Sequence, residues 1–329
     1  MTGKRIALGI ALALLATLPL WLTGIYYLNV SSQILIYAIF ALALNVLVGH
    51  AGLVSLGHAG LFGLASYACA IALQAHWGHP TAIVAALLVT LVGTAVFAFL
   101  SLRATGIGFI MITLAIGQIL WGLAYRWIDL TNGDNGVTVV ARPTLFGVPL
   151  ASPTAFYYAT LIIFLLVVLT MAIIAQSPFG ASLRGTRDQP RRMNALGYHV
   201  WMIRFYACLF SGLISGIAGI LFVYYNQFIS PQTLALTASA EVILMVISGG
   251  SGTLLGPIAG AALVVIMKNV ASAYIVRWNF LLGAIFVAIV IFMPEGLVPG
   301  TTRLWRMGRN ALQIRRKTAV VTKVLEPKS

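Results

Sequence analysis

The chain has 329 residues, of which 60% are hydrophobic and 8% are charged, whereas a soluble globular protein carries about a quarter charged residues. A formal net charge of +14 would suit nucleic acid, but the basic residues gather in short segments between apolar runs and in the C-terminal tail. Composition therefore excludes a soluble domain and a nucleic-acid-binding protein, and it indicates a chain that lies in a lipid bilayer.

Long apolar runs recur from Ile6 to Met293, and most approach the roughly 20 residues that an α-helix needs to cross a bilayer. The period-two alternation of a membrane β-barrel is absent. We predict an all-α fold, a polytopic bundle of about ten transmembrane helices. The expected spans are 6–28, 33–48, 61–75, 81–101, 107–125, 155–176, 202–225, 237–248, 257–275 and 279–293. The first resembles a signal peptide but lacks a clear small-residue cleavage site, so we expect a retained helix.

The distribution of charge predicts orientation. With this count of spans, one side of the membrane receives most of the basic residues, which marks it as cytoplasmic. These residues are Lys4, Arg5, Arg103, the arginines of loop 177–201, and Arg303, Arg306, Arg309, Arg315 and Arg316 of the tail. The opposite side receives Arg126, Arg142 and Arg277. We expect a cytoplasmic N-terminus (1–5), a transmembrane domain (6–300) and a basic cytoplasmic tail (301–329).

Two glycine-rich segments, Gly49–Gly60 and Gly249–Gly260, follow expected spans that are short for a full crossing. Irregular backbone at membrane depth is tolerated only where protein buries it or water lines it. The segments are therefore either broken helices beside a translocation path or turns at the membrane surface. The candidate path residues are Asn45, Gly49, His50, Gly52, Ser55, His58, Gly249, Gly250, Gly252 and Gly256. A hint of internal duplication comes from the glycine pairs 49/249, 52/252 and 60/260.

The polar loop Ser177–Val200 predicts a pair of short cytoplasmic helices. Ser177 suits the N-cap of a helix that starts at Pro178, and a second helix after Asp188 would stop at Gly197. Glycine is the residue best suited to left-handed backbone at a helix C-terminus. The pair is shaped to dock in a groove on a partner. The alternative is a solvated basic loop that only fixes orientation.

Neither the histidines nor the cysteines indicate a metal site or another cofactor. His50 and His58 have no Cys, Asp or Glu nearby to complete a coordination shell, so they are expected to hydrogen-bond the backbone where the helix breaks. Asn45 and Ser55 are further partners for this purpose. The two cysteines lie inside apolar runs and are expected to be buried thiols.

Glu241 and Lys268 are the two charges set inside apolar runs. An intramembrane ionisable residue is a functional-site hypothesis by default. Both residues fall at comparable depths on consecutive antiparallel spans, so we expect either a pair in the bundle interior or two side chains that each face an interface.

Three runs carry a resemblance to a known family. They are NVLVGHAGLVSLGHAGLFGLASY (45–67), SPFGASLRGTRDQPRRMNALGY (177–198) and ISPQTLALTASAEVILMVISGGSGTLLGPIAGAAL (229–263). Their order and spacing are similar to those of the LivM family, the permeases of bacterial ABC importers for branched-chain amino acids. The resemblance implies a permease in the plasma membrane, two ATP-binding subunits, a second related permease and an external solute-binding protein.

The resemblance also implies that 177–198 is the coupling segment that holds an ATP-binding subunit. Positions that match the family pattern are Arg184, Arg187, Gly197 and Tyr198, and Asp188 and Arg191 belong to the same candidate surface. Two departures stand out. Gln189-Pro190 replaces an acidic pair, which bears on the contact geometry. Thr131-Asn132-Gly133 replaces Thr-Gly-Gly, which bears on the identity of the solute.

Three other functions suit the sequence less well than that of an ABC permease. An ion-coupled secondary transporter needs intramembrane carboxylates, and Glu241 is nearly the only one. A passive channel for a neutral solute such as urea needs no docking helices. A membrane enzyme needs a cluster of His, Asp or Glu, which the sequence lacks. Because the chain also has no G-x-x-x-x-G-K-[ST] motif, we expect a non-catalytic subunit whose partners hydrolyse ATP.

Overall fold

A computed structural model describes Leu15, 17–19, 24–139, 144–145, 148–149, 152–274, 278–293 and 296–300. The expectations for residues 1–5, most of span 6–28, Arg142, Arg277 and the tail 301–329 lie outside the described residues.

The described chain is almost entirely helical. Its long helices are α2 (Ile25–Asn45) with its π-helical continuation η1 (Val46–Ala51), α3 (His58–Gln74), α4 (His79–Ser101), α5 (Ile107–Arg126), α7 (Pro153–Gln176), α10 (Val200–Asn226), α11 (Leu236–Gly249), α12 (Leu255–Tyr274) and α13 (Trp278–Phe292). Its shorter elements are α6 (Ile128–Thr131), η2 (Gly133–Asn135), α8 (Pro178–Asp188), α9 (Pro190–Ala195), η3 (Pro231–Leu234), β1 (Val137–Thr138), β2 (Thr144–Leu145), β3 (Val148–Pro149) and β4 (Phe228–Ile229). Each expected span from 61–75 onward corresponds to one long helix, which confirms the helical bundle.

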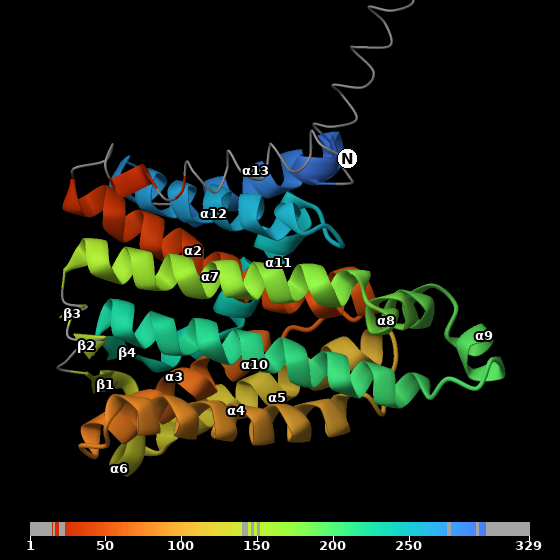
Figure 1. Cartoon of the computed structure of the whole chain (residues 1–329), viewed down its shortest axis with the longest axis horizontal. Coiled ribbons are helices and arrows are strands. Elements are labelled where there is room, and N and C mark those ends of the chain that lie inside the picture. The colour runs from red at the N-terminus through yellow and green to blue at the C-terminus, as the bar shows by residue number, and fades with distance from the viewer. Residues whose placement is uncertain are drawn as a thin grey trace, which may run out of the picture.

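The helices run side by side along the long axis of the bundle (Figure 1). The pair α8 and α9 projects from one end, called here the coupling end, and the four short strands lie at the other, called the sheet end (Figure 1). There β1 pairs antiparallel with β4, with Val137 opposite Ile229, so the loop after α6 is joined to the loop after α10. The hairpin β2–β3 places Thr144 opposite Pro149.

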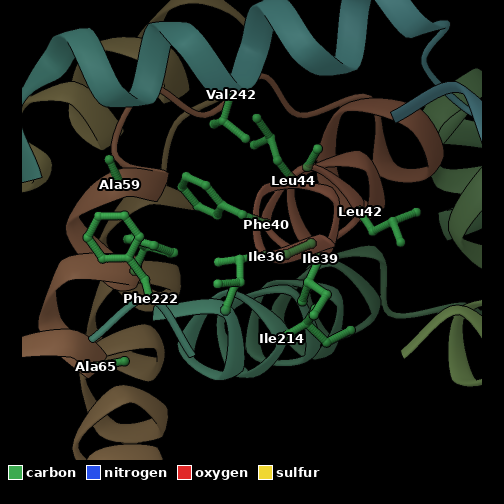
Figure 2. Close-up of a cluster of buried hydrophobic side chains, with 14 of the residues drawn as sticks. Ile36, Ile39, Phe40, Leu42, Leu44, Ala59, Ala65, Ile214, Phe222 and Val242 are labelled. Atoms are coloured by element: carbon green, nitrogen blue, oxygen red, sulfur yellow. The ribbon is translucent and has the colours of Figure 1, made fainter. Parts of the chain in front are cut away.

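Helices α2 and α10 form the centre of the bundle. Nearly every residue of α2 from Leu35 to Leu44 is buried, and these side chains pack against α3, α10 and α11 (Figure 2). Buried residues occur on every face of this stretch, so other helices surround it.

Helices α4, α5 and α7 form the periphery and expose large apolar side chains, for example Val92, Met111 and Leu166. Among the described helices, these three, α10, and α2 with η1 are each long and apolar enough to cross a membrane. Exposed aliphatic stripes of this kind are stable against lipid tails rather than water.

The expected break between spans 6–28 and 33–48 is wrong, because α2 begins at Ile25 and runs without interruption through residues 29–32. The Ser31 hydroxyl donates to the Tyr27 carbonyl at 2.8 Å, and that of Ser32 to Leu28 at 3.0 Å, so both polar side chains are satisfied within the helix. The expectation that span 33–48 is too short is wrong as well, since Ile25–Ala51 is a helical segment of 27 residues.

The crossing of α3 and α10 requires glycine at position 219. A Cβ there would come within 2.3 Å of the Phe62 carbonyl oxygen. At this contact Ser66 Oγ lies 2.9 Å from both the Phe62 and Gly219 carbonyl oxygens, which ties the two helices together. Small residues at helix crossings have this role in membrane bundles.

We therefore expect Gly219→Ala to destabilise the bundle by about 1–3 kcal/mol through overpacking, seen as a lower midpoint of thermal unfolding in detergent. Gly122→Ala is the matched control, because a Cβ at position 122 meets nothing within 4 Å. This control should stabilise α5 by roughly 0.5–1 kcal/mol, the usual gain of alanine over glycine inside a helix. Equal midpoints for both variants would contradict the close crossing.

Candidate functional site at the coupling end

Helix α8 begins as the sequence predicts. The Ser177 hydroxyl accepts a hydrogen bond from the Gly180 amide at 3.2 Å, and Pro178 occupies the first helical position. The apolar side of α8 packs against the bundle through Leu183, which is buried, and Phe179, which is partly buried. The helix is thus fixed to the transmembrane domain along one side.

Helix α9 lies beyond α8 and has no buried residue. The turn that follows it contains Gly197, whose φ of +85° is left-handed as expected. The Tyr198 amide donates to the Met193 carbonyl at 3.1 Å and the Gly197 amide to the Asn194 carbonyl at 3.0 Å, the pair of bonds that closes a Schellman turn. Leu196 and Tyr198 are exposed beside it. An exposed helix that ends in a well-defined turn with unpartnered apolar side chains is a surface suited to docking.

Two of the candidate coupling residues bind their own chain. Arg184 Nη1 donates to the Ala175 carbonyl at 2.7 Å, which ties α8 to the end of α7. The Arg187 guanidinium reaches inward and donates to the carbonyl of Gly49. Asp188 and Arg191 are exposed, and Asp188 lies 4.0 Å from Arg187 Nε.

Arg204, which sequence reasoning missed, donates to the Thr186 carbonyl at 2.8 Å and gives α8 a further anchor on α10.

Asn45, the last residue of α2, binds the second glycine-rich segment. Its Nδ2 donates to the Thr253 carbonyl at 2.9 Å, and its Oδ1 accepts from the Gly252 amide at 2.9 Å. The contact is close enough that a Cβ on Gly49 would fall 2.4 Å from the Gly252 nitrogen. The amide of Asn45 therefore completes the backbone hydrogen bonding of a turn that lies far from it in the sequence. His50 Nδ1 lies 3.3 Å from the carbonyl of Asn45 itself.

The first glycine-rich segment interrupts the helical path inside the bundle. Residues 52–57 are irregular, and α3 starts at His58 beneath them. Side chains from other helices satisfy the backbone there, because Thr113 Oγ1 accepts from the Leu56 amide at 3.2 Å and Ser239 Oγ accepts from the Ala59 amide at 3.1 Å. Ser239 precedes the end of α11 by ten residues, which is roughly 15 Å of helix, so α3 begins well inside the bundle.

The second glycine-rich segment is a tight turn between α11 and α12. Gly250 has a φ of +114° and Gly252 a φ of +79°, and the Gly256 amide donates to Thr253 Oγ1 at 3.0 Å. The two segments thus differ in form, although left-handed glycines occur at the matching positions Gly52 and Gly252. A Cβ on Gly52 would lie 2.8 Å from Arg187 Cγ, so the side chain of Arg187 covers this turn.

His58 and Ser55 are fully buried at the interruption. His58 Nε2 lies 3.1 Å from the hydroxyl of Ser211, and that hydroxyl donates to the Ala43 carbonyl at 2.5 Å. The ring therefore donates through Nε2. Its Nδ1 and the hydroxyl of Ser55 have no hydrogen-bond partner among the described residues. Cys69 and Cys208 are buried thiols.

Glu241 and Lys268 lie together in the halves of α11 and α12 that are farther from their glycine turn, so the pair is present and not two separate interface residues. Lys268 Nζ is 3.2 Å from both carboxylate oxygens of Glu241. The side chain of Glu241 is 22% exposed and that of Lys268 is 36% exposed. They lie beside a cavity of about 260 Å³ that is also lined by aromatic rings from α2, α3 and α10.

The candidate residues therefore fall into two groups. Those of the glycine-rich segments and Arg187 meet at the coupling end, whereas the charge pair lies apart from them toward the sheet end. Sequence reasoning missed four residues of the site, because each forms a hydrogen bond with a group distant in sequence and no local pattern marks it. They are Thr113, Ser239, Ser211 and Arg204.

Both departures from the family pattern have a conformational explanation. Asn132 stands where a glycine is usual and has a φ of +56°, a left-handed conformation that asparagine tolerates better than most residues. Gln189 follows α8 with non-helical backbone, and Pro190 starts α9, so the pair forms the bend between the two helices.

The apolar bundle, the interrupted helices and the projecting helical pair define a polytopic membrane transport component. Residues 26–290 match the family model described as the permease component of branched-chain amino acid transport systems, and the chain belongs to this ABC transporter permease family. The resemblance to LivM is confirmed, and the chain is a multi-pass protein of the inner membrane.

Three relatives illustrate the similarity. The chain is 28% identical over 299 residues to the high-affinity branched-chain amino acid permease LivM of Salmonella typhimurium, covering 83% of this chain and 70% of the relative. It is 28% identical over 326 residues to LivM of Escherichia coli, covering 91% and 76%. It is 30% identical over 275 residues to the autoinducer 2 import permease LsrC of Yersinia pseudotuberculosis, covering 80% and 74%. No solved structure matches the chain.

The Glu241–Lys268 pair should show a strong interaction in a double-mutant cycle. Either Glu241→Gln or Lys268→Met breaks this ionic contact and should cost several kcal/mol of unfolding free energy. The double variant should recover most of the loss. Thermal unfolding of the three variants in detergent measures the interaction energy. A value near zero would mean that the contact does not stabilise the bundle.

Proposed function

We propose that this chain is the permease subunit of an ATP-driven importer for branched-chain amino acids or a related small polar solute. It would work with two ATP-binding subunits, a second related permease and an external solute-binding protein. No catalytic step falls to this chain. The family membership supports the transport role, and the names of the relatives favour amino acids without excluding a solute such as autoinducer 2.

One observation carries the proposal. Helices α8 and α9 project from one end of the bundle (Figure 1), and Arg187 connects α8 to the carbonyl of Gly49 and the turn at Gly52. A partner that moves α8 would therefore displace the glycine-rich segment that interrupts the helical path between α2 and α3. A passive channel has no use for such a link, which disfavours that alternative.

The coupling end is the cytoplasmic end in this proposal. Arg103 follows α4 at this end, where Leu102 and Asn194 line a common cavity, and α8 and α9 add their arginines. Arg126 ends α5 near α6 at the opposite end. This uneven distribution supports a cytoplasmic coupling end by the positive-inside rule.

Co-purification and reconstitution test the proposal together. The tagged chain should bring down an ATP-binding protein and a second hydrophobic permease, and that assembly should move solute in liposomes only when ATP is supplied. The purified single chain should move nothing. Solute flux through the single chain, driven by an ion gradient or by concentration alone, would replace the proposal with a secondary transporter or a channel.

Arg187→Met should leave the importer assembled but nearly without ATP-driven uptake. Methionine removes the bond to the Gly49 carbonyl, while the exposed surface of α9 is unchanged. The measurements are co-purification of the ATP-binding subunit and uptake in liposomes. Arg126→Gln, which removes a cation from the opposite end of the bundle, is the control and should keep wild-type uptake. Wild-type uptake by Arg187→Met would remove the proposed link.

Gly197→Val should weaken docking through backbone strain alone. A Cβ at this position meets nothing within 4 Å, so a substitution adds no clash, but the φ of +85° costs a β-branched residue about 1–2 kcal/mol. Gly197→Asn is the matched control, since asparagine adopts left-handed backbone more readily. Solute-stimulated ATP hydrolysis by the assembled complex should fall in the first variant and persist in the second. Equal activities would show that the turn has no part in coupling.

A further inference from the structure

The cavity beside Glu241 and Lys268 has an apolar floor and a polar mouth. The floor is formed by Phe40, Phe62 and Phe222, each buried. The mouth is formed by the ion pair together with Gln232 and Thr237, which are exposed. A concave site with a few convergent polar groups over an apolar wall is the usual form of a small-molecule site.

The aromatic floor is fixed by contacts between its own rings. Phe40 packs on Phe62 with ring centroids 4.5 Å apart, and Phe62 meets Phe222 edge-on at 5.3 Å. Tyr37 continues the series with its ring edge-on to Phe222 at 6.2 Å. Such a wall presents apolar area with little conformational entropy left to lose, which suits an aliphatic side chain.

The two charges sum to zero and both remain open to the cavity. Lys268 Nζ and the Glu241 carboxylate touch at 3.2 Å while the side chains keep 36% and 22% of their surface exposed. A solute that carries both a carboxylate and an ammonium can exchange this contact for two of its own. A neutral polyol offers no ionic group to either residue, and a singly charged solute satisfies one of them alone.

We propose that this cavity is a binding subsite for a zwitterionic α-amino acid with an apolar side chain. Glu241 binds the ammonium of the solute, Lys268 binds its carboxylate, and the aromatic floor takes its side chain. The inference rests on the proposed transport function and narrows the solute class. Because Glu241 is on α11 and Lys268 on α12, the bound solute separates the two helices near the end opposite their glycine turn.

Binding to the full chain in lipid nanodiscs tests the subsite without partner proteins. The probe is radiolabelled L-leucine, competed by compounds that each lack one feature. L-leucinamide lacks the carboxylate, 4-methylpentanoate lacks the ammonium, and glycine lacks the apolar side chain. Each should compete about tenfold or more weakly than L-leucine, the effect expected when a charge-assisted contact or an apolar group is lost. D-ribose should not compete.

The double variant Glu241→Gln/Lys268→Met separates binding from folding. Its unfolding midpoint should stay near that of the wild type, while L-leucine binding should fall at least about tenfold with the loss of both charged contacts. Asp129→Asn/Arg126→Gln, which removes one carboxylate and one cation elsewhere, is the matched control and should bind normally. L-leucine binding that survives in the charge-pair variant, no binding to the wild type, or equal competition by D-ribose would each overturn the subsite.

ATP-driven uptake by the assembled importer is measured in parallel. Uptake of a solute by an assembly whose permease binds no L-leucine would overturn the subsite and leave the transport function standing. L-leucine binding without ATP-driven uptake by the assembly would support the subsite and overturn the importer.

Discussion

A backbone that leaves its helix inside an apolar bundle must find new hydrogen-bond partners there, because neither lipid nor an aliphatic core supplies any. This constraint shapes the coupling end of the molecule. Between residues 52 and 57 the partners are Thr113 of α5 and, at the start of α3, Ser239 of α11. At the turn between α11 and α12 the partner is Asn45 of α2, which binds both Gly252 and Thr253. Each bond joins elements that are distant in sequence, so satisfying the backbone also fixes the end of α2, the start of α3 and the α11–α12 turn relative to one another.

That fixed assembly connects α8 to the charged cavity. Arg187 binds Gly49 and covers the turn at Gly52, and Asn45 ties Gly49's neighbourhood to Gly252. From the turn, α11 leads to Glu241 over roughly 12 Å and α12 leads from Gly256 to Lys268 over roughly 18 Å. Movement of α8 therefore has a contiguous route to the positions of both charges. The route consists of hydrogen bonds and rigid helices, which is the physical form that long-range coupling requires.

The sequence predicted most helix boundaries to within a few residues, because apolar runs, glycines and prolines mark them directly. It failed at Ser31 and Ser32, which suggest a break in the apolar run. Their hydroxyls donate to backbone carbonyls one turn earlier in α2, so the helix continues through both residues. It also missed the pairing of β1 with β4, two strands of two residues each that meet only because the bundle brings their loops together. At the site, Gly197 and Ser177 could be predicted since capping is a local rule. Thr113, Ser239 and Arg204 could not, since their partners are set by the tertiary fold.

The stability of the bundle does not by itself explain the pair of Glu241 and Lys268. Even a buried ion pair is often no more stable than well-packed apolar side chains of the same volume, and this pair is only partly buried, so stability alone does not explain why the bundle contains one. Two opposite charges in one cavity also argue against ion coupling, because a coupling cation would have to compete with the ammonium of Lys268 for the carboxylate of Glu241 at 3.2 Å. A zwitterionic solute is different, since it brings a partner for each charge and leaves the net charge of the site at zero. The pair then has a reason to be in the bundle.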